Sequence, residues 1–402
     1  MCTNSLLART ALSLFACGFA AGGAPAATVL VLQFHNSSPF TDLNWVGESI
    51  ADTLRNELSA QNQIVFDRDS RAEAMRRLSL RPDAGFTKAT LIRLGQTLDA
   101  DYLCYGSYEA SLAAGETQLK QSSLRVTAHF LDLRKMHDGP DVSETGQLSE
   151  LSRLEEHLAW ESLKYVDPAA TLSVDFFLAP QKLIRMDAEE SYIRGLMSTN
   201  PDQQQKWFAQ AAALDPHFSS PAYELGRLAL QRKEYRQALT WFQRIAHENP
   251  RYPEARFEMG LAAFEAGEYS TAAGYFREAL KIYPLSEVYN DLGAAENELG
   301  LPAAIDEYRH ALEGEPDDTI YLFNLGAALL KNGYFDEAVK RLQAAVDRAP
   351  EDAAAQSLLE RARNRDAGPA GTKVAAPPRL KQSFDETAFR QLKAMVQPKQ
   401  PE

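Results

Sequence analysis

The sequence predicts an α/β N-terminal domain with a mixed sheet, followed by an all-α solenoid of helix–turn–helix repeats. Over residues 27–166, short apolar runs alternate with helical patterns, which is typical of strands interleaved with helices. Farther along, a glycine and a proline recur together, at Gly226 and Pro250, Gly260 and Pro284, Gly293 and Pro316, and Gly326 and Pro350. Self-similarity at a fixed period of about 34 residues is the signature of stacked helical hairpins.

Residues 1–26 are predicted to be a secretory signal peptide. Arg9 supplies a positive charge, residues 11–21 form a short apolar run, and Ala24-Pro25-Ala26 has the small-x-small form of a cleavage site. Two alternatives stay open: a lipoprotein signal that ends in a lipidated Cys17, and an uncleaved anchor. We therefore expect an exported protein, periplasmic or associated with the cell envelope, and attached to a membrane only if Cys17 is lipidated.

The α/β domain, residues 27–166, opens on an apolar run at residues 29–34, as expected of a strand buried on both faces. Further strands are predicted at residues 64–66, 102–108, 124–130 and 142–148. Helices are predicted over residues 43–59, after the cap residues Asp67 and Thr87, and over residues 151–166. A turn is predicted at residues 137–140, because Gly139 and Pro140 interrupt the strand pattern.

Four short phrases in this domain carry a resemblance to a known family. They are VLVLQFHNSS at residues 29–38, WVGESIADTL at 45–54, ADYLCYGS at 100–107 and LRVTAHFLD at 124–132. Together they resemble the TolB N-terminal-like domain and the related CsgG and FlgO proteins. The chain departs from that family at Asp67-Arg68 and in the hairpin at residues 136–141. The resemblance implies a bacterial cell-envelope domain that makes protein–protein contacts and performs no catalysis.

A connector at residues 167–180 leads into the solenoid, residues 181–350, which we divide into one degenerate unit at residues 188–216 and four repeats. Residues 351–365 are expected to form a capping helix. Residues 366–383, rich in glycine, proline and alanine, are expected to be a disordered linker. Residues 384–396 have the spacing of a short amphipathic helix, which we expect to dock in cis on the solenoid or to remain free.

The repeats have a recurring set of small, aromatic and turn-forming residues. The repeat at residues 254–284 shows the whole set, which consists of Gly260, Gly267, Tyr269, Ala272, Phe276, Ala279 and Pro284. Small residues let two antiparallel helices approach closely, and the proline ends the second helix. This pattern resembles tetratricopeptide repeats.

That resemblance implies that the first helix of each repeat lines a concave groove that binds a protein or peptide partner. Carried over position by position, the candidate groove residues are Tyr223, Arg227, Glu254, Phe257, Glu258, Leu261, Phe264, Glu265, Glu287, Asn290, Asp291, Glu298, Phe323, Asn324 and Lys331. An acidic centre with apolar spots at Phe257, Phe264 and Phe323 suits a basic or amphipathic peptide. The alternative is that these acids only solvate an exposed face.

Composition and motifs argue against several other functions. A formal net charge of −13 disfavours a sequence-independent nucleic-acid binder. Cys2 and Cys17 lie in the predicted signal, so the single remaining Cys104 excludes an internal disulfide framework. The sequence contains no phosphate-binding glycine loop, no H-E-x-x-H and no nucleophile elbow. We therefore expect no catalytic residue, no metal ligand and no cofactor.

The expected function is that of an exported, non-enzymatic scaffold that binds protein or peptide segments in the groove. The alternative is an envelope assembly or transport factor that oligomerises through the TolB-like domain. A third hypothesis, a hydrolase or nucleotide-binding unit hidden in residues 27–166, lacks any visible activated nucleophile or phosphate cradle.

Overall fold

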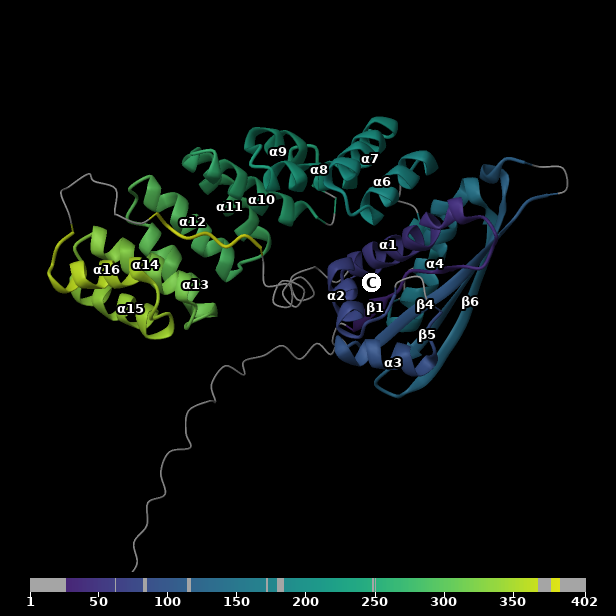
Figure 1. Ribbon diagram of the computed structural model, residues 1–402, viewed down its shortest axis with the longest axis horizontal. Helices are drawn as coiled ribbons and strands as arrows, with labels where there is room; N and C mark the ends of the chain where they lie inside the picture. Colours follow the sequence, from purple (N-terminus) through teal and green to yellow (C-terminus); the bar gives the residue numbers. More distant parts are fainter. Residues whose placement is uncertain are drawn as a thin grey trace, which may run out of the picture.

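The computed structural model describes residues 27–61, 63–81, 85–113, 117–170, 173–178, 184–247, 249, 251–367 and 377–383 (Figure 1). The predicted signal at residues 1–26 and the predicted helix at residues 384–396 lie outside these ranges. None of the helices described is both long enough and apolar enough to cross a membrane.

The N-terminal domain is built on one mixed sheet with the strand order β3-β1-β4-β5-β6, and β2 lies beside β4. The strands are β1 (Thr28–Val31), β2 (His35–Asn36), β3 (Ile64–Val65), β4 (Tyr102–Ser111), β5 (Ser123–Asp132) and β6 (His137–Gln147). β1 is parallel to β3 and β4, whereas β4, β5 and β6 are antiparallel. The predicted mixed sheet is confirmed.

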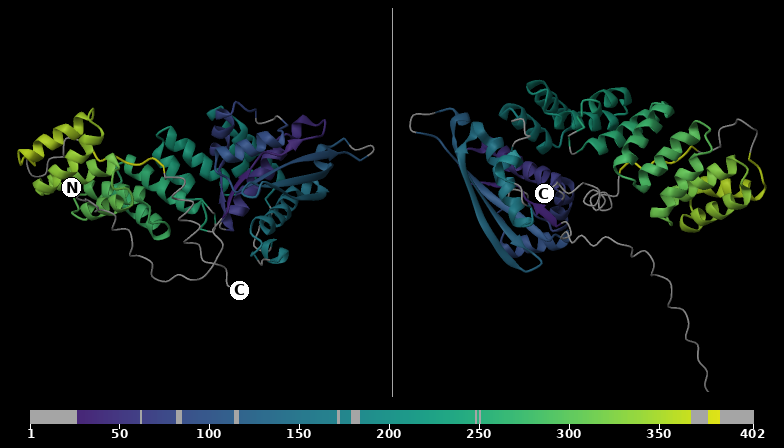
Figure 2. Two further views of the ribbon diagram at one scale, coloured as in Figure 1. Left: turned by 90° about the horizontal axis from the view of Figure 1, so that it is seen from below. Right: turned by 180° about the vertical axis from the view of Figure 1, so that it is seen from behind.

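Helices cover both faces of this sheet (Figures 1 and 2). Val29 and Val31 pack with α1 (Trp45–Ala60) and α4 (Leu151–Val166), whereas Leu30 and Leu32 pack with α2 (Arg68–Arg77) and α3 (Lys88–Thr97). Successive side chains of a strand point to opposite faces, so a strand between two helical layers must be apolar throughout. The described part of the domain also contains three 3-10 helices, η1 (Thr41–Leu43), η2 (Leu119–Gln121) and η3 (Leu148–Glu150).

The turn predicted at residues 137–140 is wrong. β6 already begins at His137, which pairs with Asp132, so the turn lies at residues 133–136 and uses Met136 at φ 53°. Pro140 is compatible with strand structure here because β6 is the last strand in the sheet order, where a missing N–H need not break the ladder.

A buried ion cluster fixes α2 to α1. Glu48 is 1% exposed, and its carboxylate accepts hydrogen bonds from Arg71 (2.6 and 2.8 Å) and Arg55 (3.3 Å). Burial by itself would raise the pKa of Glu48, but Arg71, Arg55 and Arg68 together lower it. The predicted cap is confirmed, since Asp67 accepts from the Ser70 N–H at 2.7 Å.

Beyond α5 (Val174–Leu178), the described chain forms helix pairs that stack into the predicted all-α array, with α16 at its end. The pairs are α6 (Met186–Met197) with α7 (Pro201–Leu214), α8 (Ser220–Gln231) with α9 (Tyr235–Phe242), α10 (Tyr252–Glu265) with α11 (Tyr269–Ile282), α12 (Ser286–Glu298) with α13 (Ala304–Gly314), and α14 (Thr319–Lys331) with α15 (Phe335–Arg348); α16 is Ala353–Arg363.

In each pair, a glycine of the first helix faces a large side chain of the second. A Cβ atom at Gly260 would lie 2.4 Å from the Phe276 ring, which is closer than real Cβ atoms approach. The same relation joins Gly195 to Phe208, Gly226 to Phe242, Gly293 to Tyr308 and Gly326 to Leu342. The recurring glycine is therefore a packing requirement, and the α6–α7 unit follows the same rule as the later repeats.

The α/β domain and the first helix pairs share one apolar core. Val46 and Ile50 of α1 belong to the same buried cluster as Tyr192 and Ile193 of α6 and Phe208 of α7. Figures 1 and 2 show the array leaving the domain on its α1 side. The two parts are therefore joined by packing as well as by the connector.

Candidate peptide-binding groove

Residues 377–383 run alongside α12 and α14, as the short yellow stretch in Figure 1 shows, and Arg379 also contacts Asp352 at the N-terminus of α16. We call the surface of α12, α14 and the N-terminus of α16 that holds them the groove. The disordered linker predicted over residues 366–383 is wrong for these last seven residues. Their charged side chains and backbone groups bind complementary groups of the array. The amino-acid composition of the linker does not predict these contacts.

The groove holds the backbone of this segment through side-chain amides. The Arg379 N–H donates to Asn324 Oδ1 (2.9 Å), and the Arg379 carbonyl accepts from Asn324 Nδ2 (2.7 Å) and Asn290 Nδ2 (2.9 Å). The Lys381 N–H donates to Asp291 Oδ1 (2.9 Å). Because every residue except proline carries these backbone groups, this part of the recognition does not depend on the side chain bound.

The two asparagines are also held by each other and by the array. Asn290 and Asn324 occupy successive repeats and are 0% and 1% exposed. Asn324 Nδ2 also donates to Asn290 Oδ1 at 2.8 Å, and Asn290 Nδ2 also donates to Asp291 Oδ1 at 2.9 Å. Both N–H groups of each amide are therefore used, which fixes its orientation and reduces the entropy lost on binding.

Arg379 enters a site with a carboxylate and an aromatic face. Its guanidinium donates to Asp352 through Nη1 (2.5 Å) and Nη2 (2.8 Å), and its Cζ lies 3.5 Å from the centroid of the Phe323 ring. The hydrogen bonds from Arg379 lower the pKa of Asp352 and outweigh the opposing effect of burial. A bidentate pair stacked on an aromatic ring favours arginine over lysine.

Lys381 enters a second site of the same kind. Its Nζ donates to Asp318 Oδ2 at 2.7 Å and lies 4.8 Å from the centroid of the Tyr321 ring. Between the two cations, Leu380 packs against the apolar cluster of the preceding repeats. Asp318 caps α14 by accepting from the Ile320 N–H at 2.9 Å, so its carboxylate is also held in place by its own helix.

Four of the predicted groove residues contact the segment: Asn290, Asp291, Phe323 and Asn324. Three others lie beside them, with Glu287 and Glu298 on α12 and Lys331 Nζ donating to the Asn297 carbonyl at 2.7 Å. Phe257 and Leu261 are each 1% exposed, and Phe257 packs against Phe276 at 5.8 Å between ring centroids. The apolar spot predicted at Phe257 thus lies in the packing between α10 and α11.

The remaining predicted residues gather on α8 and α10, nearer the start of the array. Arg227 lies 3.8 Å from Glu224, and Tyr223 packs under the Arg251 guanidinium at 4.9 Å. Burial raises the pKa of Glu258 to about 7 despite the attraction of Arg227. Also on α10 are Glu254, Phe264, whose ring lies 5.1 Å from that of Tyr269, and Glu265, whose Oε2 is 3.5 Å from the Tyr235 hydroxyl.

Sequence reasoning missed Asp318, Tyr321 and Asp352. The two aspartates stand two residues after Pro316 and Pro350, whereas the earlier repeats have Tyr252 and Ser286 at that position. An acidic residue at this position, found only at the start of the last repeat and of the capping helix, was the available signal. It was overlooked because the candidate positions were limited to the face of each first helix, and these residues cap its N-terminus.

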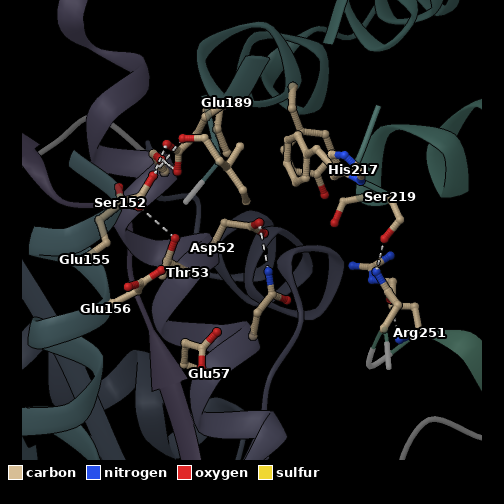
Figure 3. A pocket seen from close by; sticks show the side chains of 18 residues that line it. Asp52, Thr53, Glu57, Ser152, Glu155, Glu156, Glu189, His217, Ser219 and Arg251 are labelled. Atoms are coloured by element: carbon tan, nitrogen blue, oxygen red, sulfur yellow. Dashed lines mark hydrogen bonds between the residues drawn. The ribbon is translucent and has the colours of Figure 1, made fainter. Parts of the chain in front are cut away.

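A second polar site lies where the α/β domain meets the array, in a cavity of about 260 Å³ between α1, α4 and α6, which we call the junction cavity (Figure 3). Glu189 accepts hydrogen bonds from the hydroxyls of Ser49 (3.0 Å) and Ser152 (3.1 Å). Glu155 accepts from the Thr53 hydroxyl at 2.8 Å.

Carboxyl groups in the junction cavity have raised pKa values. Burial raises the pKa of both Glu155 and Glu189, and the charge of Glu189 raises that of Glu155 further. Burial, with the nearby charges of Glu57 and Glu189, raises the pKa of Glu156 to about 7. Within the described ranges, no group of His, Cys, Asp or Glu residues is placed to hold a metal ion.

Family models described as tetratricopeptide repeat match residues 206–287 and 301–362. No curated protein matches the chain. Similar solved structures include YrrB, described as a TPR protein with an unusual peptide-binding site, at 18% identity over 44% of this chain and 92% of that one, with a TM-score of 0.39. MamA from Desulfovibrio magneticus RS-1 is 17% identical over 42% of this chain and 99% of that one, also with a TM-score of 0.39. The two family models identify the helical array as one built of tetratricopeptide repeats.

Proposed function

We propose that the protein is an exported, non-catalytic scaffold that holds an extended segment of a partner protein in the groove. One observation carries the proposal: Asn290 and Asn324 together bind the N–H and the carbonyl of Arg379. The groove therefore binds the backbone of an extended segment, whatever its side chains are. Tetratricopeptide repeats, matched over two stretches of the array, typically bind protein or peptide partners.

The groove also suits its ligand electrostatically. Asp318 and Asp352 each bind a cation that lies over an aromatic ring, and both are held by capping hydrogen bonds from their own helices. Preorganised acceptors of this kind bind a basic segment with little loss of entropy. The proposal therefore specifies a partner segment that is extended and positively charged.

The binding function is tested by selecting peptides from a random library against the full chain. Peptides that occupy the groove should lose binding to Asn290→Ala/Asn324→Ala, by roughly tenfold or more, because two backbone-binding amides are gone. Gln343→Ala/Gln356→Ala, which removes two amides from α15 and α16, is the matched control and should bind as the wild type does. Equal binding to all three proteins would show that the groove is not the site.

Export and a cell-envelope location form the second part of the proposal, supported by the signal-like residues 1–26 and the resemblance of residues 29–132 to TolB-like domains. Mass spectrometry of the mature N-terminus distinguishes cleavage after Ala26 from lipidation at Cys17. Recovery of the intact N-terminus in the cytoplasmic fraction would contradict export.

An assembly factor that oligomerises through the α/β domain is the second candidate. The observation that favours it is the place of β6 at one end of the strand order, because an unpaired strand edge is a template for pairing with another copy. Light scattering on the purified chain tests it: a ring or higher oligomer supports this candidate, and a monomer at all concentrations excludes it.

A further inference from the structure

The segment at residues 377–383 presents its side chains in a fixed alternation. Arg379 and Lys381, two residues apart, meet Asp352 and Asp318, while Leu380 packs on the apolar cluster of the repeats before them. In an extended chain, residues i and i+2 point to the same side. This surface therefore accepts the order basic, apolar, basic, as in Arg379, Leu380 and Lys381. The groove thus recognises the two-residue spacing of the basic side chains as well as their charge.

We propose that residues 377–383 are an internal copy of the partner's binding segment, and that the partner presents an extended Arg-x-Lys sequence that must displace them. This inference rests on the proposed function, because it assumes that the groove binds a partner segment. It adds the recognition pattern and a means by which the chain regulates access to its own site.

The structure gives the internal segment the character of a weak, displaceable ligand. Pro377, Gln382 and Ser383 at its ends are exposed, and the Arg379 and Asp352 side chains of its main ion pair are 31% and 17% exposed. Pro377 and Pro378 restrict the chain to extended conformations, which lowers the entropic cost of docking. The covalent link through α16 then supplies an effective concentration on the order of millimolar.

The segment also has a direction along the array. It runs from α16, where Arg379 meets Asp352, towards α12, where the Lys381 N–H meets Asp291. Continuing along that line leads to α10 and α8, which carry Glu258 and Glu224. A partner segment longer than residues 377–383 can extend over α10, and contacts made there help it to displace the internal copy.

The test uses a labelled synthetic peptide of sequence PPRLKQS, which corresponds to residues 377–383, and full-length proteins. Fluorescence anisotropy measures its affinity for the wild type and for Arg379→Glu/Lys381→Glu, which repels the internal copy from the groove. Lys340→Glu/Arg341→Glu reverses the same two charges on α15 and is the matched control. Circular dichroism melting confirms that each variant is folded.

We expect the Arg379→Glu/Lys381→Glu protein to bind the peptide at least about tenfold more tightly than the wild type and the control do. Adding Asp318→Asn/Asp352→Asn to that protein should abolish the gain, since two charge-assisted pairs are lost. A peptide with Arg and Lys replaced by Glu should not bind either protein.

The other outcomes separate this inference from the proposed function. Equal, measurable binding to the wild type and to Arg379→Glu/Lys381→Glu would overturn the internal-copy inference and leave groove binding intact. Absence of binding to both would count against the proposed function as well. If light scattering shows the wild type as a dimer and the charge-reversed protein as a monomer, the segment binds a neighbouring chain, and occupancy in cis is wrong.

Discussion

The groove and the junction cavity use the same chemical group, a carboxyl, in opposite ways. In the groove, Asp318 and Asp352 sit at helix N-termini and meet the cations Lys381 and Arg379. In the junction cavity, Glu155 and Glu189 are buried together, and their hydrogen-bond donors are the hydroxyls of Thr53, Ser49 and Ser152. One site pairs its carboxyls with cations, and the other pairs them with neutral hydroxyl donors.

The difference shows that burial and the nearest charged donor together decide how a carboxyl titrates. Arg379 lowers the pKa of Asp352, whereas Glu155 and Glu189 have raised pKa values because burial penalises their charge and no cation offsets it. Docking in the groove should therefore respond to salt, and Asp352 should stay charged into acid. The contribution of the junction to the free energy of unfolding should depend on pH near neutrality.

The largest effect that tests this contrast is expected from Glu189→Ala. The substitution leaves the hydroxyls of Ser49 and Ser152 without their acceptor and opens space between α1, α4 and α6. We expect a loss of about 2–4 kcal/mol in the free energy of unfolding, measured by urea denaturation. Glu190→Ala on the same helix, which removes only the contact with Arg194, is the control. Equal losses would mean that the junction carboxyl is not structurally important.

The next largest effect concerns pH. A carboxyl whose folded pKa exceeds its unfolded value stabilises the fold below the unfolded value, and this contribution is lost as pH rises to the folded value. Stability should therefore fall as pH rises from about 5 to 8. Glu155 hydrogen-bonds to Glu189, and Glu155→Gln, which keeps a donor but cannot ionise, should make that fall smaller. Glu156, with its pKa about 7, preserves a residual slope; an unchanged slope would contradict the assignment.

Asp352→Asn should produce a smaller effect, confined to the groove. Native-state hydrogen exchange of the Arg379 and Lys381 amides reports on docking, since both N–H groups donate to the array. We expect about tenfold faster exchange in the variant, because one charge-assisted pair is worth about 1.4 kcal/mol. Asp347→Asn, an exposed change on α15, should leave exchange unaltered. The contribution of Asp352 to docking is present at neutral pH and is lost as pH falls through its lowered pKa.

The smallest expected effect is that of salt. The Arg379–Asp352 and Lys381–Asp318 pairs are partly exposed, so raising ionic strength from about 0.05 to 0.5 M should speed exchange of the same two amides a few-fold. The pH dependence of unfolding should change little, because the junction carboxyls are buried. If both sites respond to salt alike, the contrast between them is wrong.

The array could be predicted from the sequence because its packing repeats. Each recurring glycine faces a large side chain, so a single steric requirement appears as a column in the sequence. Asn290 and Phe323 were predicted for the same reason, since each lies three residues before the recurring glycine, as Asp291 and Asn324 lie two residues before it. Asp318 and Asp352 were missed because they lie at helix caps, and Arg379 was missed because composition alone favoured a linker.

The junction cavity left no comparable pattern. Ser49 and Glu189 are separated by 140 residues and lie on α1 and α6, and neither belongs to a motif. Their meeting depends on how the first helix pair packs against the α/β domain. Sequence periodicity predicts the contacts that recur between neighbouring repeats. The contact between the α/β domain and the array occurs at one place and has no periodic signal.

The core shared by α1, α4, α6 and α7 has a consequence for the integrity of the chain. Tyr192, Ile193 and Phe208 are buried against side chains that precede the connector at residues 167–180. A protease that cut this connector would break one covalent bond and leave that apolar contact intact. The two fragments should therefore migrate as one particle under native conditions and part only when the protein is denatured.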